Sequence, residues 1–162
     1  MSSRFISMVV SYFSGVNHFP EVVNNKIGLD TTPTIPNDAV GQGMTCLFNP
    51  VAFAGFYSSS ILYDSAKTQA GKSYKTISDV AFIEPYVRSG EIVIVYGKSS
   101  SGATHFVVVK GVEGTRTIYD TGYIDVQVNN FMINDPGANR VTLSQFLLSY
   151  QTITAIYVYN KK

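Results

Sequence analysis

Glu91-Ile-Val-Ile-Val-Tyr96 and His105-Phe-Val-Val-Val-Lys110 are the two runs that decide the fold class, and a glycine-containing turn at 97–102 separates them. Both runs are short and rich in β-branched residues, which is typical of buried strands. Phe131-Met-Ile-Asn134 and Thr152–Tyr159 have the same character and predict two further strands. The second half of the chain therefore predicts an antiparallel meander.

Helical patterns dominate the first half of the chain. Residues 5–14 are apolar with interspersed serines and predict a short helix or strand packed on the core. The dense apolar positions of 50–63 predict a buried helix, and a second helix is expected over about 79–88, with Pro85 near its end. Residues 64–76 are polar and predict a loop. Helices that precede an antiparallel sheet indicate the α+β class, with N-terminal helices packed on the sheet.

Two more patterns lie between the strands of the second half. Residues 115–120 and 123–129 predict a hairpin, and residues 143–150 have helical spacing and predict a short helix.

The length of 162 residues fits a single domain with one hydrophobic core. Residues 17–40 contain three prolines, a glycine and paired asparagines, which is typical of irregular, turn-rich chain. We therefore interpret 1–39 as an irregular N-terminal arm and 40–162 as the domain proper.

Composition and charge argue against several classes of partner. Charged residues make up 14% of the chain and the net charge is +1, so the basic surplus of a nucleic-acid-binding protein is missing. No apolar stretch approaches the roughly 20 residues of a membrane-spanning helix. The weak signal-like run 5–16 has no convincing cleavage site, which favours a cytoplasmic protein or export by another route. The oligomeric state stays open.

Cys46 is the only cysteine, so an intramolecular disulfide is impossible. A lone cysteine is most often a small buried hydrophobe. However, Cys46 directly precedes the apolar run predicted to form a helix, and a helix N-terminus lowers the pKa of a thiol and so favours the nucleophilic thiolate. The amide of Gln42 would be a second oxyanion donor beside the backbone N–H of this turn. One cysteine and two distant histidines do not supply a closed zinc site, and we expect no cofactor.

The two histidines have different contexts. His18 lies in the irregular arm, where packing is its expected role, whereas His105 opens a strand at the rim of the predicted sheet. Asp135 ends a later strand and precedes a proline, as turn residues do. In a functional interpretation, Asp135 accepts a hydrogen bond from the His105 ring and fixes its tautomer. Asn134 is an alternative orienting residue, since adjacent strand positions differ in the face to which they point.

Four segments carry a resemblance to a known family. They are Val87–Val95, Thr104–Gly111, Ile133–Pro136 and Val141–Leu148. In this order they resemble the C39-like, or double-glycine, papain-like cysteine peptidases, and the likeness extends over about residues 40–159. It implies a papain-like fold.

Carried over residue by residue, the resemblance implies Cys46 as nucleophile, His105 as general base and acid, Asp135 as orienting group and Gln42 as oxyanion donor. The chain departs from the family at Leu47 and Thr104, where glycine is usual. The gap between His105 and Asp135 is also longer than in the family, as though a hairpin were inserted.

The inserted hairpin makes Asp120 a rival orienting residue, although no proline follows it. The expected function is a cysteine-dependent peptidase or amidase that cleaves after small residues such as Gly-Gly. The alternatives are a peptidoglycan peptide hydrolase of a bacterium or phage, and a catalytically inactive binding or structural module, for example a virion-associated one.

Overall fold

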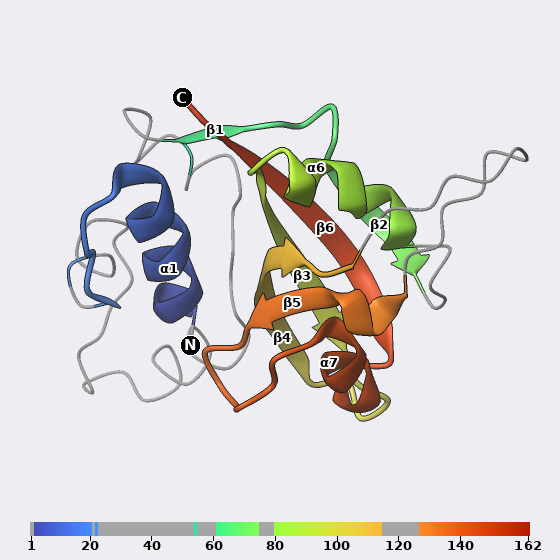
Figure 1. The fold of residues 1–162 in the computed structure, drawn as a ribbon. Coiled ribbons are helices and arrows are strands. Elements are labelled where there is room, and N and C mark those ends of the chain that lie inside the picture. The colour runs from blue at the N-terminus through green and yellow to red at the C-terminus, as the bar shows by residue number, and fades with distance from the viewer. Residues whose placement is uncertain (1, 21, 23–53, 55–60, 75–79, 115–126) are drawn as a thin grey trace, which may run out of the picture.

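The computed structural model describes residues 2–20, 22, 54, 61–74, 80–114 and 127–162. Within these ranges the chain forms three α-helices and one six-stranded antiparallel sheet, so the α+β class predicted from the sequence is confirmed (Figure 1). The helices are α1 (Ser2–Ser14), α6 (Glu84–Arg88) and α7 (Leu143–Ser149). The strands are β1 (Ile61–Tyr63), β2 (Gln69–Tyr74), β3 (Ile92–Lys98), β4 (Thr104–Val112), β5 (Phe131–Asn134) and β6 (Thr152–Lys161).

The strand order of the sheet is β1-β6-β3-β4-β5, and β2 also pairs with β6. Strands β3, β4 and β5 are neighbours in this order and form the meander expected from their β-branched runs. Strand β6 returns to the other side of β3 and then pairs with β1 and β2. The last strand of the chain is therefore central, and its backbone groups find partners on both sides.

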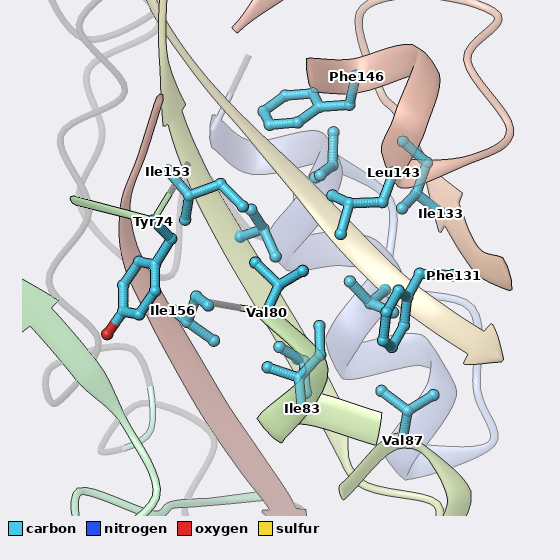
Figure 2. Close-up of a cluster of buried hydrophobic side chains, with 14 of the residues drawn as sticks. Tyr74, Val80, Ile83, Val87, Phe131, Ile133, Leu143, Phe146, Ile153 and Ile156 are labelled. Carbon is cyan, nitrogen blue, oxygen red and sulfur yellow. The ribbon is translucent and has the colours of Figure 1, made fainter. Parts of the chain in front are cut away.

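The two faces of the sheet carry separate apolar clusters because successive strand residues point to opposite sides. On the face covered by α6 and α7, which we call the α7 face, residues from both helices meet side chains of the sheet (Figure 2). Sheet residues of this face include Val93, Val95, Val107, Val109 and Ile133. Complete burial of each such side chain contributes about 1.5–3 kcal/mol.

Helix α1 covers the opposite face, the α1 face. Its residues Val9, Val10 and Phe13 are buried against Ile94 and other side chains of the sheet. The sequence left helix and strand open for 5–14, and the structure has a helix that already begins at Ser2. The described part of the expected irregular arm is therefore largely regular. The remainder of that arm, like its boundary at residue 39, lies outside the described residues.

Three sequence expectations are wrong. Ile61–Tyr63 was expected to end a helix and is a strand, and 69–74 was expected to be loop and is also a strand. Both pair with β6, for example Ile61 with Lys161 and Gln69 with Ile156, and local sequence does not encode contacts between residues so far apart in the chain. The last two residues of the expected hairpin strand 123–129 lie instead in a 3-10 turn, η2 (Val128–Asn130). The rest of that hairpin, 115–126, lies outside the described residues.

The expected helix at 79–88 is two segments, the 3-10 turn η1 (Ala81–Ile83) and α6. Pro85 was expected near the helix end, but it lies in the first turn of α6. A proline is tolerated there because the first turn has no intrahelical partner for its missing N–H. Gly90, at φ 83°, follows the end of α6 in the left-handed region that glycine adopts without strain.

Helix α7 is fixed at its start by a capping box. The Thr142 side chain accepts a hydrogen bond from the Gln145 backbone, and the Gln145 side chain accepts one from the Thr142 backbone. Such a cap stabilises a helix by about 1 kcal/mol. It also sets where Phe146 and Tyr150 lie on the sheet.

Among the described helices, none is long and apolar enough to cross a membrane.

Candidate functional site

His105 is the second residue of β4 and lies opposite Gly97 of β3. Alternation along β4 places its side chain on the α7 face, together with Val107 and Val109. Only 4% of the side chain is exposed. A histidine this deeply buried needs a hydrogen-bonding partner, because an unsatisfied buried polar group costs about 1–3 kcal/mol.

The partner is Asp135, which directly follows β5. Nε2 of His105 lies 2.6 Å from Oδ1 of Asp135, and the Asp135 side chain is fully buried. Pairing of β4 with β5 brings together two residues that are 30 positions apart, since Val108 of β4 is opposite Asn134 of β5. The Asn134 side chain makes no hydrogen bond to His105. Of the two neighbouring candidates, Asp135 is therefore the one that contacts the ring.

Asp135 uses both carboxylate oxygens. Oδ1 also accepts hydrogen bonds from the backbone N–H groups of Gly137 (2.8 Å) and Ala138 (3.1 Å), and Oδ2 accepts one from Nη1 of Arg140 (2.7 Å). The backbone bonds are those of an Asp side chain that closes its own turn. The turn-forming role and the ring-orienting role are thus performed by the same carboxylate.

The protonation state of Asp135 follows from these contacts. Burial alone would raise the pKa of the carboxyl, but the hydrogen bonds from His105 and Arg140 outweigh burial, and the pKa is lowered from its ordinary value. An ionised carboxylate only accepts hydrogen bonds, so Nε2 of His105 must be the donor. In the neutral ring, Nδ1 then carries the lone pair. The structure thus assigns Nδ1 as the basic nitrogen of His105.

Two aromatic rings from the α7 segment cover the His105 ring. The centroids of Tyr150 and Phe146 lie 5.3 and 6.2 Å from that of His105, and the two aromatic rings stack on each other at 4.9 Å. Water is excluded from this side of the His105–Asp135 hydrogen bond, which strengthens it.

Gly97 makes the approach of these rings possible. A Cβ atom at this position would lie 2.5 Å from the Phe146 ring and 2.9 Å from Cβ of Tyr150. Any side chain there would push α7 away from His105. A glycine within a strand often marks such a close approach.

The other residues proposed from the sequence divide into two groups. Cys46, Gln42 and Asp120 lie outside the described residues. His18 is described and lies just beyond α1, where its Nε2 is 3.0 Å from the Ser14 side chain. Because α1 packs on the opposite face of the sheet, His18 is separate from the His105–Asp135 pair, as expected from the sequence.

Arg140, Gly97 and Tyr150 contribute to the site but were not identified from the sequence. Arg140 follows Asp135 by five positions, a local signal that could have marked it as a partner. The roles of Gly97 and Tyr150 depend on how α7 packs on β3, which no local pattern encodes.

The described part of the chain contains no group of three His, Cys, Asp or Glu side chains that could hold a metal ion.

Comparison of the chain with protein-family models, with curated proteins and with solved structures finds no match.

Proposed function

We propose that this protein is a cysteine-dependent hydrolase of peptide or amide bonds, with Cys46 as nucleophile, His105 as base and Asp135 as the residue that orients the base. The observation that carries the proposal is the 2.6 Å contact between Nε2 of His105 and a fully buried, ionised Asp135. This contact leaves Nδ1 as the lone-pair nitrogen of a ring at the start of a strand. A histidine held by a carboxylate in this way supplies the base and the orienting group that a Cys-His-Asp triad requires, which supports the proposal.

The reaction would proceed in two steps. Nδ1 of His105 takes the proton of the Cys46 thiol, and the thiolate attacks the substrate carbonyl carbon. The C–N bond then breaks as the imidazolium gives its proton to the leaving amine, which leaves a thioester on Cys46. Water, deprotonated by Nδ1, attacks the thioester, releases the carboxylic acid product and restores the thiol. Gln42 and the Cys46 backbone N–H are the proposed oxyanion donors.

The resemblance to the double-glycine peptidases suggests the substrate class. A groove that fits small residues such as Gly-Gly excludes larger side chains by steric clash, and a peptidoglycan stem peptide or cross-bridge is the alternative acyl substrate within the same chemistry. Papain-like architecture is part of this proposal.

A catalytically inactive binding module is the second candidate, and the burial of His105 favours it. A ring that is 4% exposed and covered by Tyr150 and Phe146 also suits a histidine that only stabilises the core. The two functions differ in what they require of Cys46. A triad needs a thiolate near Nδ1, whereas a structural pair places no demand on the cysteine.

Labelling of Cys46 with iodoacetamide at pH 6 tests the proposal. The adduct is unambiguous because the chain has a single cysteine. An ordinary thiol with a pKa of about 8.5 is less than about 1% thiolate at pH 6, whereas a thiolate stabilised by an imidazolium remains reactive. We expect rapid labelling of the wild-type protein and a roughly 10–100-fold slower reaction in His105→Ala, allowing for the lower intrinsic reactivity of a low-pKa thiolate.

His18→Ala is the matched control, because it removes the other histidine and should leave the labelling rate unchanged. A wild-type Cys46 that does not react, or whose rate follows the pH dependence of an ordinary thiol, would contradict the hydrolase and favour the binding module.

A further inference from the structure

Arg140 is the third member of a chain of contacts that begins at His105. Its Nη1 donates to Oδ2 of Asp135 at 2.7 Å, the oxygen that His105 does not use. Its Nη2 donates to the Ser149 hydroxyl at 3.1 Å, and its guanidinium lies over the Tyr150 ring, 5.6 Å from the centroid. Arg140 is thus tied both to the carboxylate and to the segment of α7 that covers the His105 ring.

The pair that Arg140 forms differs from an ordinary surface ion pair. The Asp135 side chain is fully buried and that of Arg140 is 24% exposed. A buried carboxylate that loses its cation becomes an uncompensated charge, which is strongly unfavourable. Among the described residues, the charged or titratable groups that contact Asp135 are His105 from β4 and Arg140 from the loop after β5. The Ser149 hydroxyl of α7 and the Tyr150 ring after it contact Arg140 and carry no charge that could balance Asp135.

The presence of Arg140 determines whether His105 has to balance the charge of Asp135. With Arg140 present, the negative charge of Asp135 is already balanced, so His105 does not have to be positively charged to balance it. Without Arg140, His105 is the one remaining group among the described residues that contacts Asp135 and can carry a balancing positive charge. The ring would then take up a second proton at higher pH, and Nδ1 would no longer be free to act as a base.

We infer that Arg140 is a positioning residue that keeps Asp135 ionised and aligned, so that Nδ1 of His105 is available as the base near neutral pH. This inference rests on the proposed function for its catalytic meaning, but the state of the His105 ring can be measured independently of Cys46 chemistry. Arginine suits this role better than lysine because its planar fork reaches the carboxylate and the Ser149 hydroxyl together.

The test is a long-range ¹H–¹⁵N NMR spectrum of the imidazole rings of the full-length protein, recorded across pH 5–9 with Arg140 unchanged, with Arg140→Gln and with Arg140→Lys. All three proteins carry Cys46→Ala, because a Cys46 thiolate would itself keep the ring protonated. The chain has only two histidines, so His18 is an internal reference in every spectrum. With Arg140 in place we expect His105 to keep a proton on Nε2, hydrogen-bonded to Asp135. In Arg140→Gln the titration of this ring should move up by about one pH unit, with no shift of His18. Arg140→Lys should restore most of the wild-type behaviour because it keeps the charge.

Arg88→Gln is the matched control. Arg88 pairs with the fully buried Glu84 of α6, so its loss also leaves a buried carboxylate without its arginine, away from His105. We expect this variant to lower stability and leave the His105 titration unchanged. If Arg140→Gln lowers stability but the His105 tautomer and titration match those of the wild type, Arg140 is merely structural and the inference is overturned.

The outcome for Arg140 can be distinguished from that for the proposed function. If the titration of the His105 ring shifts in Arg140→Gln and Cys46 does not react with iodoacetamide, the positioning role of Arg140 is supported and the hydrolase is overturned. If Cys46 reacts but the titration of the His105 ring does not depend on Arg140, the hydrolase is supported and the positioning role of Arg140 is overturned.

Discussion

Replacement of Asp135 by alanine is expected to lower the free energy of unfolding at pH 7 by roughly 3–5 kcal/mol, the typical cost of removing one partner from a buried ion pair. The carboxylate accepts hydrogen bonds from a side chain on β4, from Arg140 and from two backbone N–H groups of its own turn. Alanine leaves all four donors without this acceptor, and the His105 donor is buried where water does not readily replace the carboxylate. Urea denaturation measures the change.

The control for this prediction is Glu113→Ala, because Glu113 is an exposed carboxylate just beyond β4 and its removal should change stability by less than about 0.5 kcal/mol. A loss of less than about 1 kcal/mol in Asp135→Ala would contradict the described network. Asp135→Asn keeps the shape and part of the hydrogen bonding, so it provides a folded variant if the alanine protein does not fold.

The pH dependence of stability gives a second readout of the same carboxylate. The pKa of Asp135 is lower in the folded protein than in the unfolded chain, so the unfolded state binds its proton first as the pH falls. The stabilisation from Asp135 is complete above its unfolded pKa of about 3.9 and is lost as the pH falls through the lower folded pKa. Asp135→Asn should therefore be less stable at pH 7 and lose part of the acid sensitivity of the wild type.

Replacement of His105 by alanine is expected to cause a large loss of activity. Removal of a general acid–base residue lowers rates by about 10²–10⁴-fold. The probe is a peptide that ends in Gly-Gly-aminomethylcoumarin, whose amide releases a fluorescent amine on cleavage. We expect kcat/KM to fall within this range in His105→Ala and to stay at the wild-type value in His18→Ala.

Cys46→Ala controls for contaminating peptidases, because a protein without its nucleophile should have no activity above background. Equal activity of the His105→Ala and wild-type proteins would contradict the assigned role of His105. No cleavage by the wild-type protein would contradict the Gly-Gly specificity.

Part of the fold could be predicted because its signals are local. Strands β3, β4 and β5 appear in the sequence as short β-branched runs between turns, and the helix at α7 follows from its spacing. Strands β1 and β2 could not be predicted in this way, since they are strands chiefly because β6 offers them an edge. Their own residues are equally compatible with helix or loop.

The candidate site also combines residues that the sequence could indicate with residues that depend on long-range packing. The pairing of His105 with Asp135 was predicted from the order of the residues along the chain and from the family resemblance, and the structure brings the two side chains to 2.6 Å. The residues that surround them depend on packing across the sheet. Gly97 is needed only because the Phe146 ring occupies the space of its missing side chain, and Tyr150 covers His105 only because α7 lies against β3 and β4.

The most direct test of the hydrolase is the distance between Sγ of Cys46 and Nδ1 of His105 in a crystal structure of the unmodified protein. A thiolate–imidazolium pair requires about 4 Å or less, with the sulfur facing the nitrogen that does not contact Asp135. That is the expected result. A sulfur buried among apolar side chains away from Nδ1 would contradict the central claim and leave the His105–Asp135 pair as a structural element of the core.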